Sequence, residues 1–149
     1  MNKASRSFIQ IKSVIKTILK RRRFADISFL DSFKRKIYDR ETDVCFELLT
    51  RDMDDWIQVE TIFLQEEYNL KRTGRQQRIE SLYAAIKAAA ISPLILDIGA
   101  NIGLASRYFD IAYPGCVIIS VEPDPGNAAI AAKNLTSNCK LLTAAVSAN

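Results

Sequence analysis

The sequence predicts an α/β protein whose core is an open, doubly wound parallel sheet. Three short apolar runs begin at residues 94, 117 and 141, and a helix-like segment separates each run from the next. Strand, helix, strand, helix and strand at this spacing indicate parallel strands joined by crossover helices. We therefore expect about three core strands, which is an incomplete sheet of this type.

The elements of this sheet are expected in order after Pro93. The first run, Leu94-Ile95-Leu96, is short, apolar and bounded by an acid and a glycine, as in a strand buried on both faces. The helix that follows is stopped by Pro114-Gly115, because proline and glycine end helical segments. We expect a strand at 94–96, a helix at 104–112, a strand at 117–121, a helix at 126–135 and a strand at 141–146.

Two further regions precede this sheet. Residues 1–25 form one region, in which apolar positions recur at helical spacing from Phe8 to Leu19 and predict a basic amphipathic helix. Residues 26–92 form a mainly helical or mixed extension before the third region, 93–149. Within the extension, apolar alternation at 38–49 and 56–68 predicts one or two strands, and the segment 76–90 predicts a helix ended by Ser92-Pro93.

Charge is concentrated at the N-terminus. The chain has 149 residues and a net charge of +4, and its first 25 residues contain eight Lys or Arg and no acid. A nucleic-acid binder needs basic residues spread over a face, so we expect no nucleic-acid partner. The basic helix at residues 8–23 either packs on its own domain or makes a peripheral membrane contact.

Histidine is absent, and the three cysteines, Cys45, Cys116 and Cys139, are far apart without a C-x-x-C pair. This composition predicts neither a metal site nor a disulfide framework, and it is typical of a reducing, cytoplasmic compartment. No apolar run reaches the length of about eighteen residues that a transmembrane helix needs. We expect Cys116, next to a buried strand, to be a small core residue.

The most informative stretch is Asp97-Ile98-Gly99-Ala100-Asn101-Ile102-Gly103, between the first strand and its helix. Open parallel sheets bind ligands beyond the carboxyl ends of their strands. Small residues at Gly99, Ala100 and Gly103 let the backbone turn tightly and approach a ligand. The spacing acid-x-G-x-x-x-G differs from the G-x-G-x-x-G of dinucleotide sites. An acid at Asp97 favours a ligand with an ammonium or sulfonium group, such as the amino-acid end of S-adenosylmethionine.

A second acid, Glu122, closes the second strand and is expected at the same crevice. A carboxylate at this position accepts hydrogen bonds from ribose hydroxyls. Taken alone, Asp97 could instead cap a helix, and Glu122 could begin a turn before Pro123. Together, at the ends of neighbouring strands, they favour a nucleoside-containing cofactor.

These motifs resemble the FkbM family of Rossmann-like, S-adenosylmethionine-dependent methyltransferases. The resemblance covers roughly residues 56–149 and rests on Leu96–Gly103, Tyr108-Phe109, Pro114 and Val121–Pro125 in that order. Asn134-Leu135, the segment 144–147 and the segment 63–68 also look like the family.

The resemblance implies that S-adenosyl-L-methionine is the cofactor. It implies that Asp97, Gly99, Asn101 and Gly103, with Ala100 between them, surround its methionine part, that Glu122 holds the ribose, and that Pro123 and Asp124 border the adenine. The methyl acceptor would be an oxygen of a small molecule or glycan. A general base would assist such an acceptor, and we identify no catalytic residue for that role.

We expect the chain to be an N-terminal portion of such an enzyme, truncated and inactive alone. In that case the strand at Leu94 would lack a neighbour, and an unpaired apolar edge favours aggregation. The alternative is a non-catalytic fragment that binds the cofactor or docks on a membrane or partner. A nicotinamide oxidoreductase is disfavoured by the glycine spacing.

Overall fold

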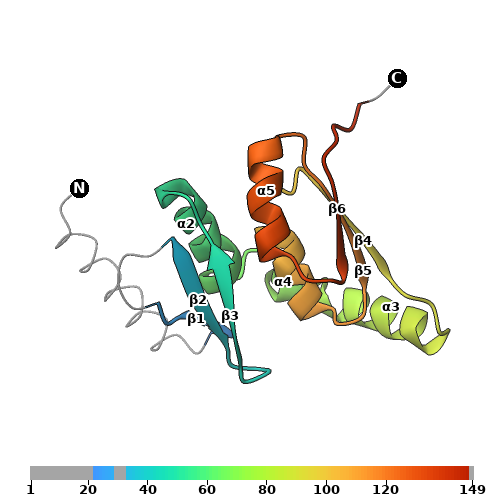
Figure 1. Cartoon of the computed structure of the whole chain (residues 1–149). Coiled ribbons are helices and arrows are strands. Elements are labelled where there is room, and N and C mark those ends of the chain that lie inside the picture. The colour runs from blue at the N-terminus through green and yellow to red at the C-terminus, as the bar shows by residue number, and fades with distance from the viewer. Residues whose placement is uncertain (1–21, 29–32, 148–149) are drawn as a thin grey trace. The chain divides into compact units, whose positions relative to one another are not determined.

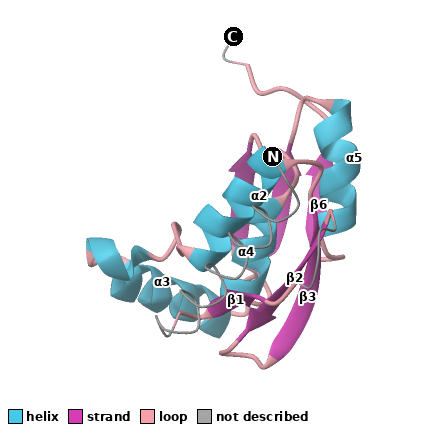
Figure 2. Cartoon of the chain, turned by 90° about the vertical axis from the view of Figure 1, so that its left-hand side faces the viewer, coloured by secondary structure: helices cyan, strands magenta, loops and turns pink. Residues whose placement is uncertain are grey.

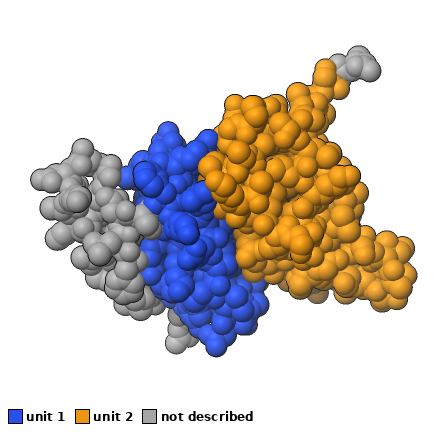
Figure 3. Space-filling view, viewed as in Figure 1, with its two compact units in different colours: residues 1–67 blue, residues 68–149 orange. Residues whose placement is uncertain are grey.

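The computed structural model describes residues 22–28 and 33–147, which divide between Glu67 and Tyr68 into two compact units (Figure 1; Figure 3). The basic amphipathic helix predicted for residues 1–25 lies outside the described residues except for positions 22–25. Residues 22–23 are not helical, and Phe24 and Ala25 belong to a strand, so the predicted end of the helix is wrong. Within the described ranges, no helix has both the length and the apolar character needed to cross a membrane.

The first unit contains an antiparallel sheet, sheet A, so this region is mixed rather than mainly helical, and the prediction of a strand within 38–49 is confirmed. Its strands are β1 (Phe24–Asp26), β2 (Lys34–Asp39) and β3 (Val44–Leu49), in the order β1-β2-β3. β2 and β3 form a hairpin (Figure 2). Its turn is closed by Asp43, whose φ of 57° places it in the left-handed region that aspartate tolerates better than most residues. Along β2, buried Ile37 and Asp39 alternate with exposed Lys34 and Lys36, as in a strand with one covered face.

A helix follows the hairpin where the sequence suggested a strand. The helix α2 (Met53–Val59) begins at Asp52, whose carboxylate accepts a hydrogen bond from the Asp55 backbone N–H at 3.0 Å. It continues into a single π-helical turn, η1 (Glu60–Leu64). The strand predicted within 56–68 is therefore wrong. The alternation suggested by Ile57 was misleading, because its side chain is 49% exposed.

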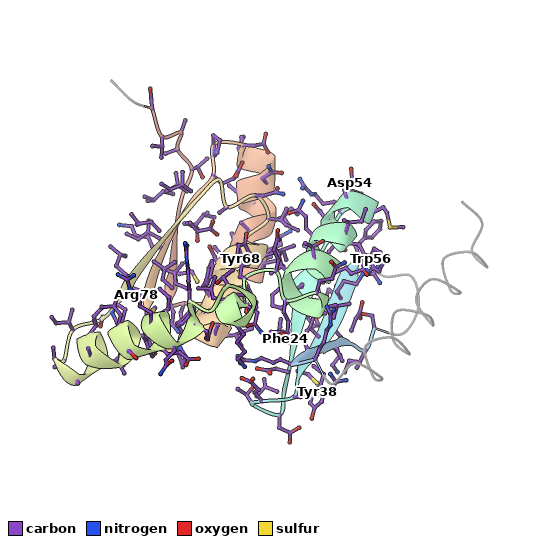
Figure 4. The ribbon with its side chains drawn as sticks, turned by 180° about the vertical axis from the view of Figure 1, so that it is seen from behind. Phe24, Tyr38, Asp54, Trp56, Tyr68 and Arg78 are labelled. Carbon is purple, nitrogen blue, oxygen red and sulfur yellow. The ribbon has the colours of Figure 1, made fainter. Side chains whose placement is uncertain are left out.

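The buried positions of α2 and η1 instead follow helical spacing. Trp56, Val59 and Phe63 recur three and four residues apart and are buried. The Phe63 ring packs edge-to-face on Phe24 with ring centroids 5.3 Å apart, and its centroid lies 5.5 Å from that of Phe46. Figure 4 shows Trp56 on α2 and Phe24 on sheet A. The core of the first unit thus joins one face of sheet A to one face of the helix.

The second unit contains the parallel sheet that the sequence predicts, sheet B. Its strands lie in the order β4-β5-β6, and both neighbouring pairs are parallel. The helices between them are α4 and α5. The bounds are β4 (Leu94–Ile98), α4 (Leu104–Ala112), β5 (Val117–Val121), α5 (Pro125–Asn134) and β6 (Cys139–Leu142).

These bounds confirm the predicted order of elements after Pro93. The helix at 104–112 and the strand at 117–121 are as expected, and the helix predicted at 126–135 begins one residue earlier at Pro125. The third strand is displaced: only Leu141 and Leu142 of the predicted range 141–146 belong to β6. The described chain is therefore α/β, with one parallel and one antiparallel sheet.

Sheet B has one covered and one open face in the described part of the chain. Both α4 and α5 lie on the same side of it (Figure 1). On that side Ile118 is buried, whereas the opposite side presents Leu94, Leu96 and Ile98, which are 57%, 58% and 61% exposed. The predicted burial of β4 on both faces is therefore wrong here. As predicted, β4 also lies at the edge of the sheet.

The helix α3 (Gln76–Ala88), preceded by the short 3-10 helix η2 (Leu70–Thr73), confirms the helix predicted at 76–90. None of its residues is buried. One of its residues, Tyr83, donates a hydrogen bond from its hydroxyl to the Pro114 carbonyl, and the Tyr83 ring packs 5.6 Å from that of Tyr113. α3 is thus attached to the connection between α4 and β5.

Candidate functional site

The candidate site begins with the loop between β4 and α4. The backbone N–H groups of Gly99 and Ala100 both donate to the Val121 carbonyl, at 2.8 and 3.0 Å. These bonds tie the start of the loop to the end of β5. The loop then turns through positive φ angles of 83° at Gly99, 49° at Asn101 and 82° at Gly103. Glycine and asparagine are the residues that adopt such angles most readily.

The small residues of this loop have two different roles. An added Cβ at Gly103 would lie 3.2 Å from the Leu135 side chain and 3.3 Å from Cα of Ala131, so this glycine allows the loop to pack on α5. At Gly99 the same added atom would meet nothing within 4 Å. Ala100 is 4% exposed and belongs to the packed part. Only Gly99 of these three therefore offers open space beside its backbone.

Asp97 lies on the helix-covered side of β4, next to Ser120 in the strand register. Its Oδ2 accepts a hydrogen bond from the Ser106 hydroxyl at 2.5 Å, and Ser106 Oγ lies 2.7 Å from Ser120 Oγ. Ser106 is in the first turn of α4, and the N-cap of that helix is Gly103, without a side-chain cap. Asp97 is therefore not a helix cap, which was the alternative interpretation of this acid.

Glu122 follows β5 and connects two loops. Its Oε2 accepts from the Asn101 backbone N–H at 2.7 Å, and its Oε1 accepts from the Asp124 backbone N–H at 3.0 Å and from Asn127 Nδ2 at 3.2 Å. The residue is 5% exposed. Its carboxylate therefore holds the β4–α4 loop against the β5–α5 loop, and its two oxygens have about four acceptor positions in all.

Asp124 and Pro123 lie at the start of α5 and are exposed. Asp124 is the N-cap of α5, and its Oδ1 accepts from the Asn127 backbone N–H at 2.7 Å. Pro125 occupies the first turn, where its missing N–H is no loss. The carboxylate of Asp124 thus has a clear structural role, and the predicted contact of Pro123 and Asp124 with adenine stays a prediction.

The structure brings the predicted site residues together at one end of sheet B. Asp97 is the penultimate residue of β4, inside the strand rather than after it as the sequence suggested, and Glu122 directly follows the parallel neighbour β5. The Asn101 backbone N–H donates to Glu122, so the β4–α4 loop lies beside this acid. Two carboxylates beside an open stretch of backbone suit a ligand that carries a positive charge and hydroxyl groups. Among the described residues, no group of three His, Cys, Asp or Glu side chains is arranged to hold a metal ion.

Sequence reasoning missed Ser106 and Ser120, and it noted Asn134 only as part of the family resemblance, without a role. Asn134, on α5, is 4% exposed, and its Nδ2 donates to the Ile102 carbonyl at 2.8 Å. This hydrogen bond holds the β4–α4 loop against α5. The available signal was a polar residue within an otherwise apolar buried element, because such a group needs a partner inside the protein. Ser120, inside the run Val117–Val121, is the clearest example.

The cysteines of the second unit lie away from this chemistry. Cys116 is 5% exposed, which confirms it as a core residue, and burial raises the pKa of its thiol. Burial likewise raises the pKa of Cys139. Both thiols are therefore protonated near neutral pH and are poor nucleophiles.

No protein-family model and no curated protein sequence matches the chain.

Proposed function

We propose that this chain binds S-adenosyl-L-methionine as part of a Rossmann-like methyltransferase resembling the FkbM family. The observation that carries the proposal is the placement of Asp97 and Glu122. These acids lie near the carboxyl ends of adjacent parallel strands, Asp97 one residue before the end of β4 and Glu122 one residue after β5, and beside them Gly99 has open space next to its backbone. Ligands of open parallel sheets lie beyond these carboxyl ends of the strands.

The charges at this edge favour one class of nucleoside ligand over another. Asp97 and Glu122 would repel a pyrophosphate, whereas a carboxylate attracts an ammonium or sulfonium group. Counted from Gly99, a dinucleotide site would also need glycine at positions 101 and 104, where this chain has Asn101 and the buried Leu104. S-adenosylmethionine combines a cationic amino-acid end with a ribose, so it matches both acids.

Each residue has a distinct part in this proposal. Asp97 would bind the cationic end, and the uncovered backbone at Gly99 would let the ligand lie against the loop. Glu122 would accept from ribose hydroxyls while it keeps Asn101 in place. When bound, S-adenosylmethionine supplies an activated methyl group, and the acceptor we propose is an oxygen of a small molecule or glycan. Transfer then depends on holding that oxygen in line with the methyl group.

The experiment is a calorimetric titration of the chain with S-adenosylmethionine. Asp97→Asn and Glu122→Gln keep side-chain size and remove the negative charge. We expect saturable binding by the wild-type chain and a loss of about tenfold or more in each variant, because a charge-assisted hydrogen bond contributes about 1.5–3 kcal/mol. The matched control is Asp54→Asn, at an exposed acid on α2 in the other unit (Figure 4).

Circular dichroism of each variant checks that it is folded. A folded wild-type chain that does not bind S-adenosylmethionine would overturn the proposal, as would equal affinity in the two site variants and the control. Binding of NAD in place of S-adenosylmethionine would favour the oxidoreductase alternative.

A further inference from the structure

Ser106 and Ser120 form a buried polar pair between α4 and sheet B. Both side chains are fully buried, and their oxygens are 2.7 Å apart. Their neighbours on these elements are mostly apolar, including Leu104 and Ile118. A hydroxyl in such surroundings is unfavourable unless it is hydrogen-bonded, and two alanines would fill most of the same space without that requirement. The pair therefore calls for a reason beyond packing.

The chemistry of the three groups fixes the direction of the hydrogen bonds. An ionised carboxylate only accepts, so the single proton of Ser106 goes to Asp97 Oδ2. The Ser106 oxygen must then accept from Ser120, which resolves the donor in the 2.7 Å contact. The result is a directed chain, from Ser120 to Ser106 to Asp97. Each bond in such a chain polarises the next and strengthens it.

The hydrogen-bond chain ends on only one oxygen of the Asp97 carboxylate. Ser106 holds Oδ2 of Asp97, and no residue in the described ranges donates a hydrogen bond to Oδ1. Asp97 and Ser120 are register neighbours on adjacent strands, so the strand backbones fix both ends of this hydrogen-bond chain. The side chain of Asp97 is therefore held at Oδ2, and Oδ1 is the oxygen that a ligand would meet.

We infer that Ser106, supported by Ser120, is a positioning residue that orients the Asp97 carboxylate toward the cationic amino-acid end of the cofactor. This inference rests on the proposed function. It predicts a selective defect: without the Ser106 hydroxyl, recognition of the cationic end weakens, and recognition of the nucleoside does not. A role in packing alone would weaken both equally.

The test compares two ligands that differ at the cationic end. S-adenosylmethionine carries the ammonium and sulfonium groups, and 5′-methylthioadenosine keeps the nucleoside but lacks both. For Ser106→Ala we expect about tenfold weaker binding of S-adenosylmethionine and a change within about twofold for methylthioadenosine, measured by calorimetry. Ser120→Ala should give a smaller loss in the same direction, because it removes the second donor of the chain.

Three controls define the role. Ser106→Thr retains a hydroxyl and should restore most of the affinity for S-adenosylmethionine. Ser81→Ala removes an exposed hydroxyl from α3 in the same unit and should change neither affinity. In an Asp97→Asn background, Ser106→Ala should have little further effect, since residues that act through one another are not additive.

The outcomes distinguish a failure of the proposed function from a failure of the positioning role of Ser106. If the folded wild-type chain does not bind S-adenosylmethionine, the proposed function and this inference both fail. If the wild-type chain binds and Ser106→Ala weakens both ligands by the same factor, or neither, the inference alone is overturned. Full additivity of Ser106→Ala with Asp97→Asn would overturn it as well.

Discussion

Replacing Gly103 with alanine is expected to destabilise the second unit more than the same replacement at Gly99. Both glycines have nearly the same positive φ, 82° and 83°, so the backbone cost of about 1–2 kcal/mol for an L-residue is common to both. The surroundings differ. The new Cβ at Gly103 would lie 3.2 Å from Leu135 and 3.3 Å from Cα of Ala131, whereas the one at Gly99 would meet nothing within 4 Å.

The close contact at Gly103 adds an overpacking cost of about 1–3 kcal/mol, because the helix backbone at Ala131 cannot move aside as a flexible side chain can. We therefore expect a loss of about 2–5 kcal/mol for Gly103→Ala and about 1–2 kcal/mol for Gly99→Ala. Gly99→Ala, in turn, should have the larger effect on binding relative to its effect on stability.

The assay is urea denaturation followed by far-ultraviolet circular dichroism. The fluorescence of Trp56, the only tryptophan of the chain, reports separately on the first unit. If the two signals coincide, one transition describes the chain, and the free energies apply to it as a whole. A Gly103→Ala variant that is as stable as Gly99→Ala would refute the reasoning about the contact with α5.

Other predictions concern single contacts. The Arg51 side chain, against the opposing effect of burial, lowers the pKa of Asp55 below its ordinary value of 3.8. The resulting stabilisation is complete above that pH and is lost as the pH falls through the lowered folded-state pKa. Asp55→Asn should therefore flatten the pH dependence of the unfolding free energy in this acid range, and an unchanged slope in urea titrations would contradict this. Asn134→Ala removes the donor to the Ile102 carbonyl and should lower the unfolding free energy by about 1–3 kcal/mol in the same urea assay. A loss below about 0.5 kcal/mol would contradict this. Leu96→Lys, at a side chain that is 58% exposed, should change stability by less than about 0.5 kcal/mol and reduce binding of an apolar dye such as ANS. Unchanged dye fluorescence would show that the open face of sheet B does not bind it.

The sequence predicted sheet B well because its signals are local and mutually consistent. Apolar runs and the stop at Pro114-Gly115 mark element boundaries, and the spacing implies parallel pairing. The cap at Asp124, which the sequence analysis did not use, explains why α5 begins at Pro125. The first unit was harder to predict. Around Ile57 the apolar residues fit both the period of two of a strand and the period of a helix over a few residues. The structure there is a helix, which begins at the cap Asp52.

The site was predictable in its positions and less so in its contacts. Asp97 and Glu122 lie at the carboxyl ends of β4 and β5, as the pattern suggested, although β4 continues to Ile98 and so includes Asp97. The distinction between Gly99 and Gly103 depends on α5, which packs against one and not the other. The hydroxyl of Ser106 comes from nine residues further along the chain than Asp97. Such contacts depend on how the helices pack, which residue spacing alone does not specify.

The pairing of β4 has a consequence for synthesis on the ribosome. In the hairpin of sheet A, Asp39 pairs with Val44, only five residues on, so that pairing forms as soon as the chain emerges. In sheet B, Leu94 pairs with Val117, 23 residues on. At about 5–20 residues per second, β4 is made roughly 1–5 s before its neighbour β5 is complete. During that interval the backbone of β4 lacks its strand partner, and pairing with β5 later satisfies that backbone but leaves Leu94, Leu96 and Ile98 exposed.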